Sequence, residues 1–547
     1  MAHALLVGYA GYPYTPNRLT LHNGLANMAG ALVDSGHDVE IIDYGTVSVM
    51  RRLFPRELHE RAKPMAQKMM AAGGPPSEEA VEMIGAMARQ LQAHQREEQG
   101  RIAAELAQRV SETQPDMVVF QVWDGDGFTG SVALAEAIRD EEPEIAVYAS
   151  GPQAARFHEY FYRKTDVFDA VIHGEAEAVV PELARVVEGE KSLAELQGIA
   201  WKDGSKVRRA PRGVRMAMDD LPEPIYDESV YAAMAGDEKI KIARLDDSRG
   251  CPNKCYFCTH PTEEGDELRV ASADQLAGRM ERMINRYGLR VYHFAGSSTP
   301  GSLLHGVARE ILDRDLDVVY SSFGHYGSSE PEHFELMTQS GLHSIFFGLE
   351  SGCEEVLEKA VGPVKARNLG NAKRVNRMAQ EAGIFTIASV IVPLPFDTEE
   401  TLRESLEFVV DMGPDSVTMQ FPGLLPGTPW FEDMERFGFE ADPEQIMVEG
   451  LDYKLKLMFP PQFWEAPPYT LNGMSFEEYT RLTGKFAAGL EAQGILTGIS
   501  HYNALISECA GIDPVKFRDL ARLWCFTGDA DAMAEMTAAA NESIVAG

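Results

Sequence analysis

The sequence predicts an α/β protein built around two parallel sheets, with a mainly helical C-terminal segment. Two observations lead to this fold class. Short apolar runs alternate with segments of helical apolar spacing across residues 5–187, and the same alternation returns across residues 273–420. Strands that alternate with helices form parallel sheets, because each helix carries the chain back across a sheet face. The length of 547 residues allows about three or four domains.

The first alternation predicts a doubly wound parallel sheet in residues 1–195. Between its second and third strands, residues 46–112 are predicted as a mostly helical insertion. Ligands of such sheets bind beyond the carboxyl ends of the strands. The five predicted strands are residues 5–8, 39–43, 117–122, 145–149 and 170–172.

Residues 196–240 contain Pro211, Pro222 and Pro224 among charged residues and are predicted as a linker. A second set of strands and helices follows in residues 241–435. Six strands separated by helices are expected there, with a site again at their carboxyl ends. Five of these strands are predicted at residues 291–295, 318–322, 344–348, 386–392 and 416–420.

Three cysteines lie close together at the start of this second set. Cys251, Cys255 and Cys258 have Cys-x3-Cys-x2-Cys spacing within residues 248–258. Thiolates are the soft ligands of iron–sulfur clusters, and three of them on one short loop suit three corners of a [4Fe-4S] cluster. The fourth iron would then be open to a small molecule.

Zinc and disulfides are the alternative interpretations of these cysteines. Structural zinc takes four ligands, and His260 is the residue nearby that could serve as the fourth. A disulfide framework is disfavoured, because six cysteines in 547 residues are sparse. The remaining cysteines, Cys353, Cys509 and Cys525, are expected to be buried thiols.

The cysteine spacing, with Phe257 directly before the third cysteine, resembles the signature of the radical S-adenosylmethionine (SAM) superfamily. The resemblance implies a partial (β/α)6 barrel, a [4Fe-4S] cluster and SAM bound to the open iron. Residues 347–352 resemble the Gly-Leu-Glu-Ser-Gly segment that ends the fourth strand in this family, and residues 425–429 resemble its Pro-Gly-Thr-Pro turn. By this resemblance, SAM contacts are expected from Phe257, Gly296, Ser297, Ser298, Glu350, Ser351, Val390 and Ile391.

The sheet of residues 1–195, placed before this motif, resembles the cobalamin-binding domain of cobalamin-dependent radical SAM enzymes. The residues that carry the resemblance are the turn Ser150–Pro152 and the segment 174–177, where the family often has Gly-Glu-Gly-Glu. The Asp-x-His-x-x-Gly motif is absent, so no histidine is expected on cobalt, and His22, His37 and His173 are interpreted as surface or packing residues. Cobalamin contacts are expected from Tyr9, Tyr12, Gln121, Ser150, Gly151, Pro152, Gln153, His173, Gly174, Glu175 and Glu177.

The end of the third strand in the second set differs from many relatives, which place an arginine near it. Here Tyr320, His325 and Tyr326 supply titratable groups. They are candidates to accept a proton from substrate or to shape an aromatic pocket, and packing is the alternative for each.

Residues 436–547 resemble the variable cap that such enzymes lay over the substrate. Their aromatic, proline-rich stretch, residues 460–469, includes Trp464 and Tyr469. These two residues are candidates to line the substrate pocket, and packing between domains is the alternative.

Charge and hydropathy restrict the partners. Fifty basic and 84 acidic residues give a formal charge of −34, which repels nucleic acids and anionic lipids. No apolar run approaches the roughly 20 residues of a membrane span, so a cytoplasmic protein is expected. A small-molecule substrate and a low-potential electron donor are the predicted partners.

The resemblance implies a methyltransferase that moves a methyl group from SAM through methylcobalamin to a carbon of a small molecule of the secondary-metabolite or antibiotic type. A polar variant, in which an electron-rich ring such as that of tryptophan attacks methylcobalamin, remains open. The alternatives are a rearrangement or cyclisation with the same cofactors, and a cobalamin or cluster sensor without turnover.

Overall fold

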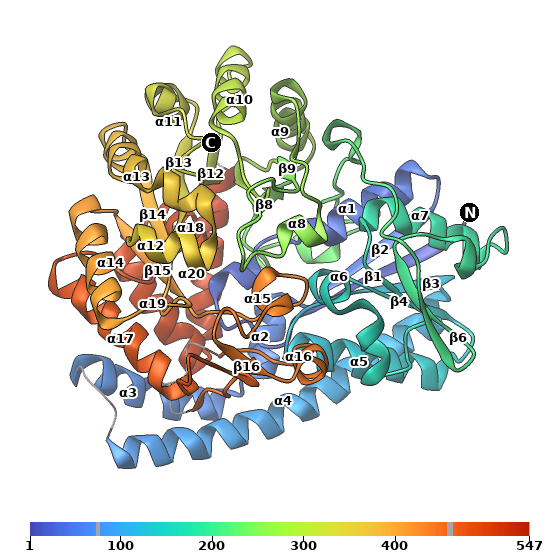
Figure 1. The fold of residues 1–547 in the computed structure, drawn as a ribbon. Coiled ribbons are helices and arrows are strands. Elements are labelled where there is room, and N and C mark those ends of the chain that lie inside the picture. Colours follow the sequence, from blue (N-terminus) through green and yellow to red (C-terminus); the bar gives the residue numbers. More distant parts are fainter. Residues whose placement is uncertain (73–76, 457–462, 546–547) are drawn as a thin grey trace.

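The computed structural model describes residues 1–72, 77–456 and 463–545, and its strands form two large sheets (Figure 1). The first, called here the N-terminal sheet, has the strand order β2-β1-β3-β4-β5-β6-β7. Its first five strands are parallel, as predicted, and their order is that of a doubly wound fold. The strands are β1 His3–Tyr9, β2 Asp38–Asp43, β3 Met117–Val122, β4 Ala146–Ser150, β5 Ala170–Ile172, β6 Ile199–Asp203 and β7 Lys206–Arg209.

The strands β6 and β7 correct the linker prediction for residues 196–240. They form an antiparallel hairpin that extends the N-terminal sheet beyond β5. The turn between them contains Gly204 at φ +61°, a conformation that glycine adopts without strain. The proline-containing part of the segment contains only short 3₁₀ turns up to Met234.

Helices cover both faces of the N-terminal sheet. Alternate side chains of β1 enter two different cores: Ala4 and Leu6 pack with α1 and α7, whereas Leu5 and Val7 pack with α4 and α5. Among the described residues, three helices lie between β2 and β3, where the helical insertion was predicted. The helices of this region are α1 Asn23–Asp34, α2 Val47–Leu53, α3 Arg56–Ala72, α4 Glu78–Thr113, α5 Asp126–Glu141, α6 Pro152–Phe157 and α7 Ala176–Val187.

The second sheet, called the barrel sheet, has six parallel strands in the order β15-β14-β13-β12-β11-β8. The five predicted strands are confirmed, and the sixth is β8, which directly precedes the cysteines. Among the described residues β8 and β15 do not pair, so the barrel is open. The strands are β8 Ile242–Leu245, β11 Val291–Phe294, β12 Val319–Gly324, β13 Leu342–Glu350, β14 Phe385–Ile391 and β15 Ser416–Gln420.

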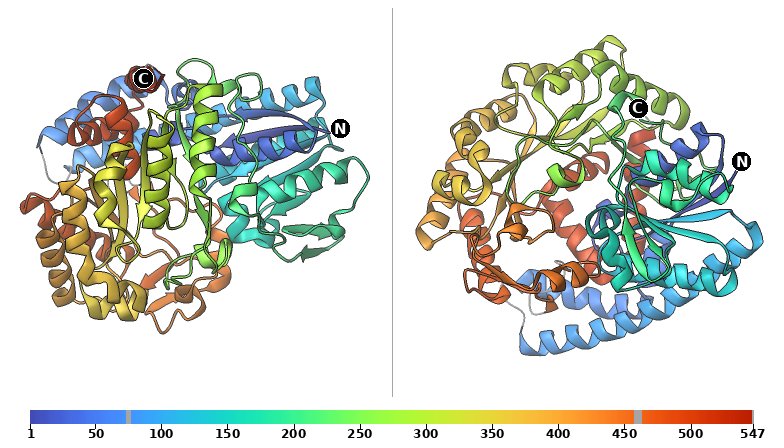
Figure 2. Two further views of the ribbon diagram at one scale, coloured as in Figure 1. Left: turned by 90° about the horizontal axis from the view of Figure 1, so that it is seen from above. Right: turned by 45° about the vertical axis from the view of Figure 1, so that its right-hand side comes forward.

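A fan of helices surrounds the outer face of the barrel sheet (Figure 2). It consists of α9 Ala273–Tyr287, α10 Gly301–Asp313, α11 Phe334–Gln339, α13 Pro363–Glu381 and α14 Glu399–Met412. The opposite face contacts a C-terminal helix, α18 His501–Cys509. The ring of His501 stacks on His293 of β11 at 4.5 Å and meets Phe323 of β12 at 4.9 Å.

The remaining C-terminal elements include a small antiparallel sheet, β16 Phe439–Ala441 with β17 Tyr469–Leu471. The helices are α15 Pro429–Glu432, α16 Pro443–Glu449, α17 Phe476–Ala492, α19 Pro514–Thr527 and α20 Ala530–Val545. The first three residues of the predicted aromatic loop, 460–462, lie outside the described residues. Within the described part of the chain, no helix is both long and apolar enough to cross a bilayer.

Candidate active site

The three cysteines lie on the loop between β9 Ser248–Arg249 and α8 His260–Glu263, called here the cysteine loop. The loop begins at Gly250, whose φ of +81° and close packing exclude a side chain: a Cβ there would lie 2.2 Å from the Glu267 carbonyl oxygen. The backbone N–H of Tyr256 donates to the Val361 carbonyl at 2.9 Å. All three cysteines are free thiols. The loop therefore presents them together at the carboxyl end of β8.

The three sulfur atoms are not grouped as tightly as the ligands of a single zinc ion. Two thiolates on one tetrahedral zinc ion lie about 3.8 Å apart, since Zn–S bonds measure about 2.3 Å. The three sulfur atoms do not all lie within 4.8 Å of one another. The alternative fourth ligand, His260, instead pairs with Glu264, with Nδ1 and Oε1 3.2 Å apart. Burial raises the pKa of Cys255 to about 11 and that of Cys258 to about 12, so a soft cation is needed to hold them as thiolates.

Asp247, which the sequence analysis missed, organises the end of β11 next to this loop. Its buried carboxylate accepts hydrogen bonds from the Gly296 N–H at 2.6 Å and from the Thr299 hydroxyl at 2.8 Å. Burial raises its pKa to about 6. Ser297 donates to the Gly250 carbonyl at 2.5 Å, and the Ser298 carbonyl accepts from Ser248 at 3.2 Å. The segment predicted to contact SAM is thus fixed against the cysteine loop.

Glu350 ends β13 in the left-handed conformation, with φ +67°, and forms a buried ion pair. Its Oε1 lies 3.2 Å from Nζ of Lys365, which also donates to the Gly348 carbonyl. Burial raises the pKa of Glu350, and Lys365 opposes that shift. A Cβ at Gly348 would lie 2.4 Å from Oε1 of Glu350. The sequence analysis did not single out Lys365, which no motif distinguishes from an ordinary helix lysine.

The other predicted SAM contacts lie in more apolar surroundings. Val390 and Ile391 are buried on β14. The ring of Phe257 packs 5.7 Å from that of Trp430. The hydroxyl of Ser351 pairs with that of Ser405 at 2.7 Å, which directs it toward α14.

Of the three candidate catalytic residues, His325 has a ring nitrogen that makes no hydrogen bond within the described residues. Its Nδ1 accepts from the Gly327 N–H at 3.0 Å, while its buried Nε2 has no hydrogen-bond partner in the described part of the chain. Burial and then the charge of Lys365 lower its pKa to about 4, so it is neutral at pH 7. Tyr320 is directed away from the site, because its hydroxyl pairs with Ser340 at 2.8 Å behind the sheet. Tyr326 is buried with its ring stacked on Phe347 at 4.4 Å.

At the N-terminal sheet, several residues predicted to contact cobalamin are held by other parts of the chain. Tyr12 donates to the Cys525 carbonyl at 2.9 Å. The ring of Tyr9 packs on α5, where a Cβ at Gly130 would lie 2.1 Å from it. Gln153 donates to the carbonyls of Gly450 and Leu451 at 3.0 and 2.9 Å. These three side chains therefore join the sheet to the C-terminal segment or to its own helices.

Glu175 and Glu177 were also predicted as cobalamin contacts. In the structure each pairs with an arginine of residues 249–269, the segment that contains the cysteine loop. Glu177 accepts from Arg249 at 2.6 Å, and Glu175 accepts from Arg269 at 2.5 Å. Arg249 immediately precedes the cysteine loop and also lies 3.2 Å from Asp246. The two glutamates thus connect the ligand edge of the N-terminal sheet to the cysteine loop.

The edge of the N-terminal sheet keeps a polar surface of amides, hydroxyls and turns. Gln121 and Ser150 are buried at the ends of β3 and β4, and Gly151 has φ +98°. Pro152 begins α6. Gly174 packs against Gly198, and a Cβ on Gly174 would lie 2.9 Å from Cα of Gly198. These residues therefore form neutral, closely packed turns at the carboxyl ends of β3, β4 and β5.

Two histidines at this edge have buried Nε2 atoms without a hydrogen-bond partner among the described residues, His22 and His173. His22 was interpreted as a surface or packing residue, but it lines a cavity of about 290 Å³ together with Arg18, Trp123 and Arg244. Burial lowers its pKa to about 3. His173 lies 5.7 Å from the ring of His158, and burial lowers its pKa to about 4.

A second cavity of about 230 Å³ lies between this edge and the C-terminal segment. Gln153 and Arg156 line one side, and Tyr453, Lys454 and Tyr469 line the other. Tyr469, a predicted pocket residue, therefore borders it. The ring of Trp464 packs on Phe421 at 5.8 Å.

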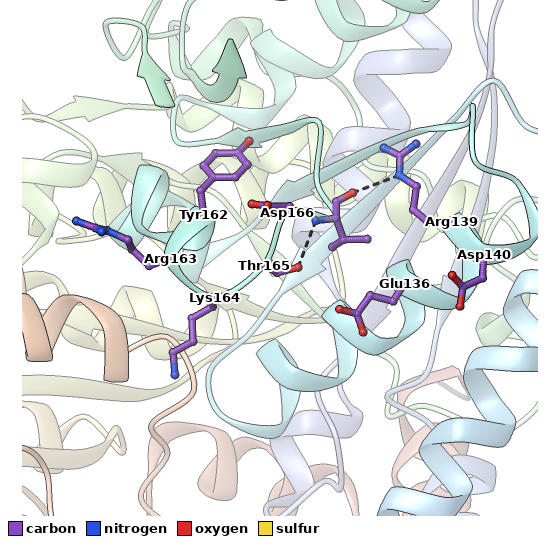
Figure 3. A pocket seen from close by; sticks show the side chains of 9 residues that line it. Glu136, Arg139, Asp140, Tyr162, Arg163, Lys164, Thr165 and Asp166 are labelled. Carbon is purple, nitrogen blue, oxygen red and sulfur yellow. Dashed lines mark hydrogen bonds between the residues drawn. The ribbon is translucent and has the colours of Figure 1, made fainter. Parts of the chain in front are cut away.

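A larger surface depression of about 540 Å³ lies elsewhere (Figure 3). Charged side chains from Glu136 to Asp166 surround it, and Arg139 donates to the Val167 carbonyl at 3.4 Å. It adjoins the amino end of β5, opposite the ligand edge, and includes none of the predicted site residues.

The segment that contains the cysteine loop was compared with known protein families. Residues 246–409 match the radical SAM superfamily. This segment, called here the radical SAM domain, is similar to that superfamily. It contains the cysteine loop, the Asp247 network and the Glu350–Lys365 pair.

Characterised and annotated proteins that resemble this chain have low sequence identity to it. An uncharacterized methyltransferase of Pyrococcus horikoshii is 23% identical over 55% of this chain and 65% of that protein. The cobalamin-dependent radical SAM methyltransferase TokK of Streptomyces tokunonensis is 22% identical over 61% of this chain and 51% of TokK. The chain thus spans about half to two thirds of the length of these relatives.

Solved structures match over more of the chain. The methyltransferase TsrM from Kitasatospora setae, with cobalamin and a [4Fe-4S] cluster bound, has a TM-score of 0.61 at 14% identity and covers 98% of this chain and 99% of TsrM. The enzyme OxsB with aqua-cobalamin bound has a TM-score of 0.56 at 16% identity, over 80% of this chain and 56% of OxsB. The predicted fold, and the resemblance to cobalamin-dependent radical SAM enzymes, are confirmed.

Proposed function

We propose that the protein is a cobalamin-dependent radical SAM enzyme that methylates a carbon atom of a small organic molecule. The observation that carries the proposal is the contact between two ligand edges. Arg249, one residue before the cysteine loop of the radical SAM domain, is paired with Glu177 of the N-terminal sheet. A cluster on the loop and a cofactor at the sheet edge would therefore be neighbours.

The residues present fit both cofactors. Cys251, Cys255 and Cys258 would hold a [4Fe-4S] cluster, and the Gly296–Ser298 segment with Glu350 would hold SAM. The polar edge formed by Gln121, Ser150–Pro152 and His173–Gly174 would hold cobalamin. When bound, these groups supply reductive cleavage of SAM and a transferable methyl group.

The side chains around the loop would position and protect the reacting groups. The charges of Lys365 and Glu350 act on the pKa of Cys255, so this ion pair lies beside the loop. Its ammonium and carboxylate are suited to opposite charges of an amino acid group. The neutral Nε2 of His325, next to Lys365, can accept a proton or a hydrogen bond.

The cavity bordered by Tyr453 and Tyr469 is the proposed substrate entrance, since it joins the ligand edge to the C-terminal segment. Its lining is aromatic and aliphatic with a few charged groups, which suits a small organic molecule. A low-potential electron donor is part of the proposal, because such clusters have potentials down to roughly −700 mV.

The test is anaerobic reconstitution with iron, sulfide and hydroxocobalamin, followed by mass spectrometry of SAM products with candidate substrates. S-adenosylhomocysteine with 5'-deoxyadenosine and a methylated product supports radical methylation. S-adenosylhomocysteine with a methylated product but without 5'-deoxyadenosine supports the polar route. 5'-Deoxyadenosine alone supports rearrangement or cyclisation, and binding of the cofactors without SAM turnover supports a sensor. Failure to bind cobalamin refutes the proposal.

A further inference from the structure

Three metal-ligand side chains converge outside the site described above. His305 lies on the second turn of α10. Glu330 precedes the 3₁₀ helix Pro331–His333 that leads into α11, and His333 ends that helix. One ligand atom from each lies within 4.8 Å of the other two. In the described ranges 1–72, 77–456 and 463–545, no other three histidine, cysteine or acidic residues meet this criterion.

The distances are close to those of a coordinated ion. Oε2 of Glu330 lies 3.8 Å from Nδ1 of His305 and 3.9 Å from Nε2 of His333. Two ligand atoms on a tetrahedral ion with bonds of about 2.1 Å lie about 3.4 Å apart. Small side-chain rotations that shorten each of these two distances by about half an ångström would bring them to that value. The three side chains are 28%, 34% and 36% exposed, so an ion can enter and water can fill a remaining position.

The backbone already holds these residues together. The N–H of Gly301, one turn before His305, donates to the Ser328 carbonyl at 2.9 Å. A Cβ at Gly301 would lie 2.6 Å from the Glu330 nitrogen, so the helix approaches the loop as closely as glycine permits. The N–H of His333 donates to the Glu330 carbonyl at 3.0 Å. Binding an ion therefore requires little ordering of the chain.

The two histidine rings lie next to each other, and one of them must turn before both can ligate the same ion. Their centroids lie 3.6 Å apart with an interplanar angle of 19°, so the rings are stacked rather than dispersed over the surface. A pair of imidazoles with one carboxylate is a donor set of zinc and of non-haem iron sites, both of which keep positions open for water.

We propose that His305, Glu330 and His333 bind one divalent transition-metal ion, Zn²⁺ or Fe²⁺, with water at the open position. The ion fastens the loop of residues 325–330 to α10. This loop begins with His325, whose carbonyl accepts the N–H groups of Ser328 and Ser329 at 3.0 and 3.1 Å. The site thus steadies the barrel mouth without belonging to the cysteine loop or its ligands.

The first experiment is calorimetric titration of Zn²⁺ into the cluster-loaded, cobalamin-loaded protein after dialysis. His305→Ala, His333→Ala and Glu330→Gln are each expected to lose about one equivalent of binding or at least tenfold in affinity. The matched control is His343→Ala, because His343 Nε2 lies 3.7 Å from Glu508 Oε2 without a second histidine. This control is expected to bind like the wild type. Equal binding by all variants overturns the proposal, as does an equal loss in the control.

A second measurement separates this ion from zinc on the thiols and identifies the metal. A variant with alanine at Cys251, Cys255 and Cys258 is expected to retain the site. Crystals of this variant, grown after purification without added metal and again after soaking in Zn²⁺, are measured at the zinc and iron absorption edges. An anomalous peak between His305 and His333 supports the proposal, and the edge at which it appears identifies the ion. Absence of a peak after soaking overturns it.

Discussion

Replacing Arg249 with methionine should strongly destabilise the junction between the N-terminal sheet and the radical SAM domain. The Arg249 guanidinium lies 2.6 Å from Glu177, 3.2 Å from Asp246 and 3.6 Å from Glu175. These side chains are 7–16% exposed, so removing the cation leaves three nearly buried carboxylates without their shared partner. Breaking a buried pair in this way costs about 3–5 kcal/mol.

The assay is thermal unfolding by circular dichroism at pH 8. For a cooperative unit of about 150–250 residues, each kcal/mol shifts the midpoint by about 2–4 °C, so the expected loss is roughly 6–20 °C. The matched control is Arg282→Met, which removes an exposed pair with Glu223 at 2.6 Å and should cost less than about 1 kcal/mol. Equal shifts in the two variants would refute the reasoning.

The pH dependence of the same variant gives a second check. Burial raises the pKa of Asp246, but Arg249 and hydrogen bonds outweigh it, and the pKa is lowered overall. A carboxylate with a lowered folded pKa contributes stability above its unfolded pKa and loses it only as the pH falls through the folded value. Without Arg249 the pKa of Asp246 rises, because burial is then opposed by the hydrogen bonds from Asn27 and Asn23 alone. The deficit of Arg249→Met should therefore be smaller at pH 6 than at pH 8, and adding Glu177→Gln should recover part of it.

Three further predictions concern the site. Cys251→Ala should abolish bound iron and SAM cleavage with unchanged circular dichroism. The control Cys353→Ala, which changes a buried thiol outside the cysteine loop, should retain the iron and the cleavage. Iron assays check this, and equal iron in the two variants would contradict it. Glu350→Gln and Lys365→Met should each weaken SAM binding at least tenfold in equilibrium dialysis, because each leaves a buried charge or amide without its partner; unchanged binding would exclude a role for the pair. His325 has a lowered folded pKa of about 4, so its stability contribution is present above pH 6.5 and is lost as the pH falls. Because other buried histidines such as His22 and His173 behave in the same way, the loss of unfolding free energy between pH 7 and 5.5 should be about 1 kcal/mol smaller in His325→Gln than in the wild type. Parallel pH curves would count against the buried neutral imidazole.

The sequence predicts the parallel sheets and the cysteine loop because both depend on local patterns. Apolar runs of four residues mark β1 and β3, and the three cysteines lie within a stretch of eight residues. That the strands run parallel then follows from the rule that each helix returns the chain across the sheet, whereas their order is given by the structure.

The parts that sequence reasoning missed depend on contacts between distant segments. Glu177 and Arg249 are 72 residues apart, and nothing in either segment indicates that they pair. Lys365 lies 15 residues after Glu350 on a helix with several other basic residues. Tyr320 was assigned to the barrel mouth from its place in the strand, but the pleat of β12 directs its side chain to Ser340 behind the sheet.

The packing of the C-terminal helices has a consequence for how the chain folds as it is synthesised. Tyr12 is hydrogen-bonded to Cys525, and Phe54 packs so closely on Gly528 that a Cβ there would lie 2.1 Å from its ring. Trp524 and Met533 belong to the same hydrophobic core as Leu5 of the first strand. The segment around β1 therefore cannot complete its core until Cys525, 513 residues after Tyr12, has been synthesised.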